Sequence, residues 1–315
     1  MNITVLDRAT LGEGIEFSCI EKLGTLTIYD STKQEEAADR IKDSDVVILN
    51  KIKMREDNLK DAKNLKLICV TATGYDNIDI DYCRKRGIAV CNVVGYSTDS
   101  VAQLTVALVL NHMMHISEYT DFVTSGKYTE SGIANRLSPC FYELKGKTWG
   151  IVGMGNIGRS VAKVAEAFGC KVICTRRQKD PEYETLPLEK VMESADIVSV
   201  HLPLSEQTKN IIDSDMISKM KKGAVLVNVA RGAVIDEKAA ADAVKNERIY
   251  FATDVYSVEP LQKEHPFYEI RDHKNLILTP HMAWGAYEAR VRCIEEIAVN
   301  ITAFFDGRIR NRVDI

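Results

Sequence analysis

The sequence predicts an α/β protein with parallel sheets in two parts of the chain. Residues 2–95 and residues 147–281 each alternate short apolar runs with polar segments of helical spacing. Strands that alternate with helices along a chain are typical of parallel sheets covered on both faces. A long helical segment, from residue 98 to about residue 118, lies between the two stretches. It begins with residues 97–100 (STDS), which are of the types that cap helices. We expect this helix to join two lobes.

Each stretch contains several runs with the length and composition of a strand. In the first stretch the expected strands are residues 3–6, 26–29, 46–49, 67–70 and 88–91, separated by helical segments such as 34–42 and 80–86. In the second stretch they are residues 149–152, 171–175, 197–201, 225–229, 251–255 and 276–279. Ligands of open parallel sheets bind at the carboxyl ends of strands, so the polar residues that follow these runs are the first candidates for a site.

Length and composition indicate a globular protein of two domains. The chain has 315 residues, of which 45% are hydrophobic and 27% charged, and its formal net charge is −4. This charge balance indicates no basic surface for nucleic acid or for an anionic membrane. The first residues lack the charged head and long apolar stretch of a signal peptide, and no apolar run reaches transmembrane length.

The cysteines and histidines give no sign of a metal site. The eight cysteines are scattered and contain no C-x-x-C pair, which favours free thiols in a reducing cytoplasm over a disulfide or zinc framework. His112 and His115 lie three residues apart on the expected long helix, but no acid or cysteine supports them at ligand spacing. His265 and His273 lie in polar stretches, where we expect solvated side chains.

A glycine run identifies the expected nucleotide site. Gly153, Gly155 and Gly158 form a G-x-G-x-x-G pattern directly after an apolar strand and before a helical segment. The first glycine permits a tight turn, the second lets a pyrophosphate approach the backbone, and the third lets the helix pack close to the strand. The free N–H groups around Asn156 and Ile157 at the helix start then face the phosphates. The alternative is a plain strand-to-helix turn.

The end of the next strand bears on the choice of cofactor. An NAD site usually has an acid about twenty residues past the glycines, where it holds the ribose 2′-hydroxyl. Here the strand 171–175 ends in Arg176 and Arg177, and the first acid is Asp180. Two guanidinium groups suit a 2′-phosphate, and Thr175 adds a hydroxyl donor. We therefore expect a preference for NADP(H), with NAD(H) possible; a solvated basic turn is the alternative.

Three strand ends carry complementary side chains for reducing a carbonyl group. Arg231, Glu259 and His281 follow three successive expected strands. Histidine titrates near neutrality and suits the proton donor, while a neighbouring carboxylate favours its charged form and orients it. Arginine can hold a substrate carboxylate and polarise the adjacent carbonyl.

Taken together, the motifs resemble the D-isomer-specific 2-hydroxyacid dehydrogenase family over essentially the whole chain. They are residues 73–79 (TGYDNID), 95–98 (GYST), the glycine run, 201–204 (HLPL), 229–232 (VARG), 254–260 (DVYSVEP) and 279–281 (TPH). The segments 281–285, 288–290 and 49–51 are most similar to the glycerate dehydrogenase/hydroxypyruvate reductase branch.

The resemblance implies roles for many of these residues. Arg231 would bind substrate, His281 would be the acid/base, and Glu259 would pair with the histidine. The backbone at Thr73, Gly74 and Tyr75 would hold the substrate carboxylate, and Asp254 would bond the nicotinamide carboxamide. The other expected cofactor-binding residues are His201, Pro203, Thr208, Val229 and Ala230. By their positions in the sequence, two further residues are candidates. Trp284, three residues after His281, is expected in the wall of the substrate pocket, with a core position as the alternative, and Lys51, after the third strand, is either a substrate-carboxylate contact or a surface charge.

The resemblance also implies an architecture: two flavodoxin/Rossmann-like lobes with an active-site cleft between them. On this basis residues 1–96 and 288–315 form the substrate domain, and residues 97–287 form the dinucleotide-binding domain. Members of the family are usually dimers, so we expect a homodimer. The cysteines described above favour a cytoplasmic location.

The function expected from the sequence is NAD(P)H-dependent reduction of a 2-oxoacid of the hydroxypyruvate or glyoxylate type to the D-2-hydroxyacid. The nicotinamide would supply the hydride and His281 the proton. One alternative is a reductase for a bulkier branched-chain or aromatic 2-oxoacid. The other is a protein that binds NAD(P) as a sensor without catalysis.

Overall fold

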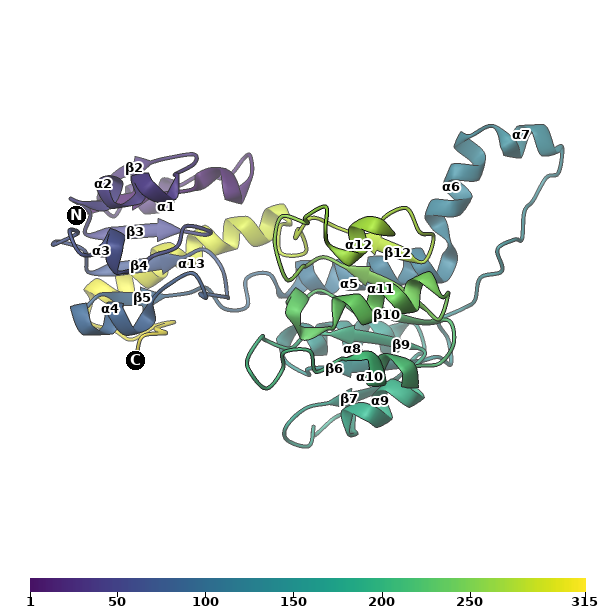
Figure 1. Ribbon diagram of the computed structural model, residues 1–315. Helices are drawn as coiled ribbons and strands as arrows, with labels where there is room; N and C mark the ends of the chain where they lie inside the picture. The colour runs from purple at the N-terminus through teal and green to yellow at the C-terminus, as the bar shows by residue number, and fades with distance from the viewer. The chain divides into compact units, whose positions relative to one another are not determined.

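The chain forms two compact units in the computed structural model, which describes residues 1–315 (Figure 1). Unit 1 consists of Met1–Ser97 and Trp284–Ile315, and unit 2 is the continuous segment Thr98–Ala283. The sequence places the junctions after residues 96 and 287, whereas the structure has them after residues 97 and 283. The second junction comes earlier because Trp284 and Ala286 pack against the apolar core of unit 1.

Unit 1 is built on a five-stranded parallel sheet in the order β2-β1-β3-β4-β5. Its strands are β1 (Asn2–Val5), β2 (Thr25–Ile28), β3 (Val46–Leu49), β4 (Leu67–Val70) and β5 (Ala89–Cys91). All five expected strands are present, with ends shifted by one residue at most. The order is that of a flavodoxin-like sheet, in which ligands bind at the carboxyl ends of the strands where the order reverses, here β1 and β3.

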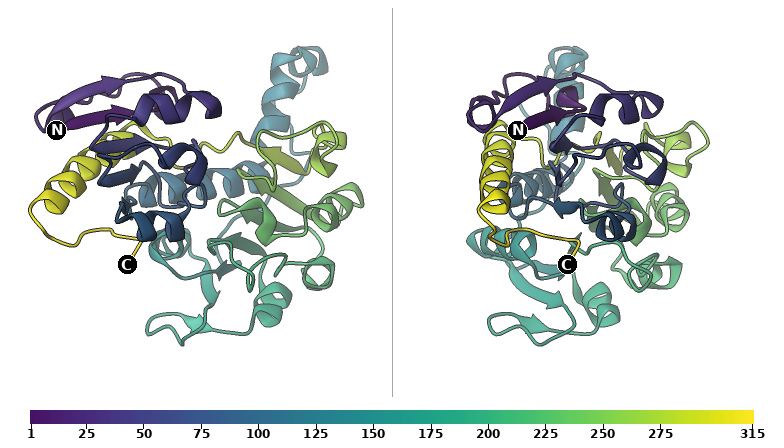
Figure 2. Two further views of the ribbon diagram at one scale, coloured as in Figure 1. Left: turned by 60° about the vertical axis from the view of Figure 1, so that its left-hand side comes forward. Right: turned by 90° about the vertical axis from the view of Figure 1, so that its left-hand side faces the viewer.

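The pleat of these strands sends alternate side chains into two apolar cores. Val46 and Ile48 of β3 enter one core, and Val47 and Leu49 enter the other. Helices α1 (Ser18–Glu21) and α13 (Tyr287–Phe305) cover the first core (Figure 2). The 3₁₀ turns η1 (Arg8–Leu11) and η2 (Gln34–Glu36) and helices α2 (Ala37–Ile41), α3 (Glu56–Leu59) and α4 (Ile80–Arg86) complete the unit.

Helix α13 returns from the end of the chain to unit 1 because one of its faces is apolar. Ala289, Cys293, Ile297 and Ile301 recur every fourth residue, and all four are fully buried. Residues four apart lie on one face of a helix, so this stripe packs continuously on the sheet. The last helix of the chain therefore completes the first core.

Unit 2 is built on a seven-stranded parallel sheet in the order β12-β11-β10-β9-β6-β7-β8. Its strands are β6 (Thr148–Val152), β7 (Lys171–Thr175), β8 (Glu184–Thr185), β9 (Ile197–Val200), β10 (Ala224–Asn228), β11 (Ile249–Thr253) and β12 (Leu276–Leu278). The sequence does not predict β8, because two residues carry no alternating pattern. The strand order reverses between β6 and β9, the point where a doubly wound sheet binds its ligand.

The helices of unit 2 cover its sheet, apart from one projection. They are α5 (Thr98–Met114), α6 (Ile116–Thr124), α7 (Lys127–Ser131), α8 (Asn156–Ala167), α9 (Leu188–Ser194), α10 (Ser214–Lys219), α11 (Glu237–Lys245) and α12 (Pro266–Glu269). The expected helix end near residue 118 is wrong, because His115 has a φ of +53° and interrupts the helix. Residues 115–143, here called the arm, contain no buried residue, and α6 and α7 project away from the sheet (Figures 1 and 2). None of the helices combines the length and apolarity that a membrane crossing needs.

Candidate active site

Three side chains follow adjacent strands at the carboxyl edge of the unit 2 sheet. Arg231 comes after β10, Glu259 after β11 and His281 after β12, and these three strands pair in parallel register. Nδ1 of His281 lies 2.6 Å from Oε2 of Glu259. The contact between acid and imidazole that the sequence predicts is therefore present within unit 2.

The geometry of this pair determines which imidazole nitrogen remains available. The two side chains are part-buried, with 26% of His281 and 30% of Glu259 exposed. An ionised carboxylate only accepts hydrogen bonds, so Nδ1–H of the ring is the donor. Nε2 makes no hydrogen bond within the chain. The carboxylate thus orients the ring and leaves one nitrogen free to hold or release a proton.

Arg231 lies at the same edge but does not touch the pair. Its Nη1 donates to the backbone oxygen of Ala230 at 2.8 Å, and its other guanidinium nitrogens have no partner within the chain. The structure thus leaves part of the planar fork available for an anion. Its convergence with His281 on one substrate remains a prediction.

Asp254 holds the turn that carries His281. Its completely buried carboxylate accepts hydrogen bonds from Thr279 Oγ1 at 2.6 Å and from the N–H groups of Met282 and Ala283 at 2.9 and 2.7 Å. His281 itself has a φ of +54°, a left-handed conformation that costs on the order of 1 kcal/mol for a residue with a Cβ. The three hydrogen bonds offset this strain and fix the ring's position. Sequence reasoning missed this role, while the contact of Asp254 with the cofactor remains a prediction.

A second acid–imidazole pair holds the loop that carries Glu259. The N–H of Ser257 donates to Oε1 of Glu237 at 2.8 Å, and Oε2 of Glu237 lies 2.9 Å from Nε2 of His265. Nδ1 of His265 accepts the N–H of Phe267 at 3.2 Å, so Nε2–H is the donor to Glu237. The expectation of a solvated His265 is wrong, because its side chain is almost completely buried. The sequence contains a signal for this buried position: His265 directly precedes Pro266, the first residue of α12, and its side chain caps that helix.

Glycine is required where the Arg231 and Glu259 segments meet. Gly232 begins the 3₁₀ turn η3 (Gly232–Val234). A Cβ at this position would lie 2.1 Å from the carbonyl carbon of Tyr256 and 2.2 Å from the nitrogen of Ser257. Tyr256 is anchored in turn, because its hydroxyl donates to the backbone oxygen of Thr279 at 2.9 Å. The loops after β10, β11 and β12 are therefore packed as one body.

The glycine run has the geometry of a dinucleotide site. Gly153 has a φ of +100°, and a Cβ there would lie 2.8 Å from the backbone oxygen of His201. A Cβ at Gly158 would lie 2.4 Å from the oxygen of Gly153, while one at Gly155 would meet nothing within 4 Å. The first N–H groups of α8, from Asn156 onward, have no side-chain cap. Open space beside uncapped N–H groups fits a pyrophosphate.

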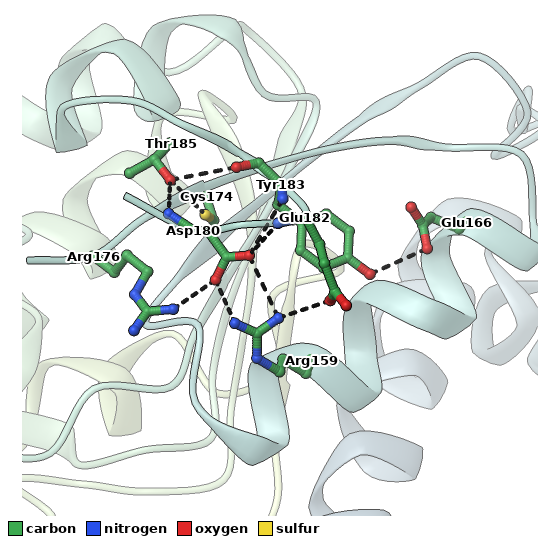
Figure 3. Close-up of polar contacts among 8 residues, drawn as sticks. All are labelled: Arg159, Glu166, Cys174, Arg176, Asp180, Glu182, Tyr183 and Thr185. Atoms are coloured by element: carbon green, nitrogen blue, oxygen red, sulfur yellow. Dashed lines mark hydrogen bonds and ion pairs between the residues drawn. The ribbon is translucent and has the colours of Figure 1, made fainter. Parts of the chain in front are cut away.

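The residues after β7 form a polar cluster around Asp180 (Figure 3). Nη1 of Arg176 donates to Oδ2 of Asp180 at 2.6 Å, and Arg159 of α8 contacts the same oxygen at 2.5 Å. Arg177 points elsewhere and donates to Oε1 of Gln207 at 2.6 Å. The alternative of a solvated basic turn is therefore wrong for Arg176, whose guanidinium is part-buried and paired, whereas Arg177 is exposed.

The Asp180 carboxylate is ionised under all ordinary conditions. Burial acts to raise the pKa of this carboxyl, but the N–H of Glu182 and the guanidinium groups of Arg176 and Arg159 lower it to about 2. Its side chain is completely buried. A permanent negative charge therefore lies between two positive ones.

The remaining predicted cofactor residues are mostly held by contacts within the chain. His201 is buried, its Nε2 lies 3.0 Å from Ser199 Oγ, and burial lowers its pKa to about 3. Its Nδ1 is buried without a partner. The hydroxyl of Thr208 donates to the oxygen of Pro203 at 2.6 Å and closes the loop after β9. Thr175 ends β7, while Val229 and Ala230 follow β10.

The predicted substrate-binding residues of unit 1 lie at the carboxyl edge of its sheet. Lys51 follows β3, and its N–H donates to the buried carboxylate of Asp7 at 2.7 Å. Thr73, Gly74 and Tyr75 follow β4 and are exposed or part-exposed. Trp284 packs against the unit 1 core. Their contact with substrate remains a prediction.

Comparison with known proteins identifies the family. A family model described as "D-isomer specific 2-hydroxyacid dehydrogenase, NAD binding domain" matches residues 106–283. The chain belongs to this family. The dehydrogenase is 33% identical to the hydroxypyruvate reductase of Blautia hydrogenotrophica over the whole of both chains. It is 39% identical to the glyoxylate reductase of Thermococcus litoralis over 82% of this chain and 79% of that one.

Solved structures show the same fold. The D-lactate dehydrogenase of Aquifex aeolicus, complexed with NAD and lactic acid, has a TM-score of 0.86 at 27% identity, with 100% and 99% of the two chains covered. An acyclic imino acid reductase in complex with NADPH and D-Arg has a TM-score of 0.88 at 28% identity, with 99% and 100% covered. This protein is thus a nicotinamide-dependent D-2-hydroxyacid dehydrogenase with two Rossmann-like units, which reduces a 2-oxoacid to the D-2-hydroxyacid.

Proposed function

We propose that this dehydrogenase reduces a small 2-oxoacid of the hydroxypyruvate or glyoxylate type and prefers NADP(H) to NAD(H). The observation that carries the proposal is the contact between His281 and Glu259 at the sheet edge that also bears the glycine run. The names of the hydroxypyruvate and glyoxylate reductases among its relatives support the substrate class.

In this proposal His281 supplies the proton. Because Glu259 accepts the Nδ1 hydrogen, the ring presents Nε2 to the carbonyl oxygen of the substrate. Glu259 stabilises the imidazolium before transfer and keeps the neutral ring in one orientation afterwards. A bound reduced nicotinamide would supply the hydride.

Arg231 binds the substrate carboxylate in this scheme. Only one of its guanidinium nitrogens is engaged, by the oxygen of Ala230, so the rest of the fork can accept a carboxylate. Holding that carboxylate orients the neighbouring carbonyl and draws electron density from it. The bidentate geometry needs arginine, so lysine is a poor replacement.

The residues after β7 support the preference for NADP(H). The position where an NAD site has an acid is occupied by Arg176, and the nearest acid, Asp180, is completely buried. Nε and Nη2 of Arg176 have no partner within the chain. A guanidinium with free donors suits a 2′-phosphate better than a ribose hydroxyl.

The direct test is a panel of 2-oxoacids assayed with both reduced cofactors. We expect hydroxypyruvate and glyoxylate to have higher kcat/KM values than 2-oxoisocaproate and phenylpyruvate, and NADPH to be preferred. His281→Ala should lower kcat by about 10²- to 10⁴-fold while the Kd for NADPH stays within twofold. Retained turnover in this variant would contradict the role of His281, and a best substrate with a bulky side chain would contradict the substrate class.

We further propose that the enzyme is a homodimer. The arm exposes several large apolar side chains, which a monomer rarely leaves in one segment. They are Ile116, Val123, Ile133, Leu137, Phe141 and Tyr142. A second copy of the chain is the partner that would cover them, and a mass of two chains in light scattering would support this.

The cysteines support a cytoplasmic location for the enzyme. All eight are free thiols, and six of them are buried. Burial raises the pKa of Cys293 to about 12 and that of Cys83 to about 11, which keeps these thiols protonated and unreactive. Such a set suits a reducing compartment, and fractionation of cells would test it.

A further inference from the structure

Asp180 is buried near the end of β7 and accepts hydrogen bonds through both of its carboxylate oxygens (Figure 3). Its Oδ2 accepts from Arg176 and from Arg159 at 2.6 and 2.5 Å. Its Oδ1 accepts the N–H groups of Glu182 and Tyr183 at 3.0 and 3.3 Å. Its own N–H donates to Thr185 Oγ1 at 2.8 Å. The carboxylate is thus held by backbone and side chains together.

These contacts exclude Asp180 from the usual role of an acid in this region. A carboxylate that binds the ribose must expose an oxygen with spare acceptor capacity. The side chain of Asp180 is completely buried, and both oxygens already accept two or more hydrogen bonds. Asp180 therefore holds neighbouring residues in place rather than binding a ribose hydroxyl.

The hydrogen bond to Asp180 fixes one nitrogen of the Arg176 guanidinium and leaves the other two free. Only Nη1 faces Asp180, while Nε and Nη2 have no partner within the chain. An arginine held by one nitrogen loses less conformational entropy when the remaining donors bind an anion. The free donors lie on a side chain with 31% exposure, which a ligand can reach.

Arg159 connects the same carboxylate to the glycine run. It directly follows Gly158 in the first turn of α8, and it also pairs with Glu182 at 3.0 Å. Without a carboxylate between them, the Arg159 and Arg176 guanidinium groups would repel each other. Asp180 therefore allows two positive side chains, one from α8 and one from the end of β7, to lie close together.

We propose that Asp180 is a positioning residue for the 2′-phosphate of NADP(H), which it serves by anchoring Arg176 with its free donors available. This inference rests on the proposed NADP(H) preference. It assigns Asp180 to cofactor selectivity although Asp180 itself contacts no cofactor. A lysine at position 176 would not be sufficient, because Asp180 would engage its single ammonium group and leave no donor for the 2′-phosphate.

The test is binding of two small probes, adenosine 2′,5′-bisphosphate and ADP, measured by calorimetry on the full chain. Asp180→Asn should weaken binding of the 2′-phosphorylated probe about tenfold and change that of ADP by less than twofold. The matched control is Asp196→Asn, which removes a carboxylate paired with Lys221 and the N–H of Thr148 in the same unit. This control should leave the ratio of the two affinities unchanged.

Arg176→Lys gives a second measurement that does not require removal of the buried carboxylate. Lysine keeps the charge but offers one ammonium group, which Asp180 would engage, so this variant should lose as much affinity for the 2′-phosphorylated probe as Arg176→Gln. Wild-type affinity in Arg176→Lys, or equal weakening of both probes in Asp180→Asn, would overturn the anchoring role.

The same measurements separate this inference from the proposed function. If Arg176→Gln binds the 2′-phosphorylated probe as well as the wild type does, the NADP(H) site itself is misassigned, and the inference is overturned with it. If Arg176→Gln weakens that probe while Asp180→Asn and Arg176→Lys do not, only the anchoring role is overturned. A matching loss in Asp180→Asn, Arg176→Lys and Arg176→Gln supports both.

Discussion

Gly232→Ala tests whether the loops after β10 and β11 form one catalytic body. The new Cβ would lie 2.1 Å from the carbonyl carbon of Tyr256, whereas ordinary contact begins at 3.4 Å. The obstructing atoms are backbone, so no side-chain rotation relieves the clash. The segment that leads to Glu259 must therefore retreat by about 1.3 Å. Arg231, the preceding residue, is subject to the same displacement.

The expected cost is mainly catalytic. A misplacement of about 1 Å in a catalytic constellation can reduce the rate on the order of 100-fold, so we expect kcat/KM for the best 2-oxoacid to fall by about that factor. Overpacking should also lower the free energy of unfolding by about 1–3 kcal/mol. The Kd for NADPH should change much less than kcat/KM, because the glycine run and the residues after β7 lie on other strands and only Val229 and Ala230, among the expected cofactor residues, border the displaced loop.

The assay is steady-state reduction of that 2-oxoacid, together with calorimetric binding of NADPH and urea unfolding of each variant. Gly150→Ala is the matched control, because its Cβ would lie 2.5 Å from the Cγ1 atom of Val191 in the core of the same unit. It should lower stability without changing kcat/KM in conditions where it stays folded. A folded Gly232→Ala variant with kcat/KM within threefold of the wild type would refute the reasoning.

Three further predictions follow from the buried imidazoles, the loop after β11 and the arm. Burial lowers the pKa of His112 from 6.5 to about 4 in the folded protein. Between pH 6.5 and pH 4 the unfolded state therefore binds more protons than the folded state, so the free energy of unfolding falls as the pH decreases through this range. We expect His112 to account for a loss of about 2 kcal/mol in the free energy of unfolding between pH 7 and pH 5, measured with urea; an equal loss in His112→Gln would contradict this. Glu237→Gln should weaken the contact with Ser257 and lower kcat about tenfold with the Kd for NADPH unchanged, measured by the same assays; an unchanged kcat would argue against a positioning role. Leu137→Glu combined with Phe141→Glu should halve the mass in light scattering, and an unchanged mass would remove the arm from the subunit interface.

The strands and the order of the site residues could be predicted from the sequence. A buried parallel strand such as β3 is a continuous apolar run, and the glycine run is a local pattern with its own steric logic. The sequence could also predict the common edge of Arg231, Glu259 and His281. Parallel strands have their carboxyl ends at one edge of the sheet, so residues that follow different strands meet there even when they are far apart in the chain. The signals that predict each strand and the glycine run depend only on neighbours within a few residues, and the common edge follows from the parallel arrangement of the strands.

Only the tertiary structure decided how those residues are held. Asp254 accepts hydrogen bonds from the turn that carries His281. Glu237, paired with His265, holds the loop that carries Glu259. Asp180 binds two arginines from different elements. Each contact joins segments whose loops have no repeating pattern, so no periodicity in the sequence predicts which atoms meet. The break at His115 was missed for the same kind of reason, because its left-handed backbone contradicts the helical pattern around it. Local patterns determine the elements and the edge where the chemistry lies, whereas packing between loops determines the distances on which that chemistry depends.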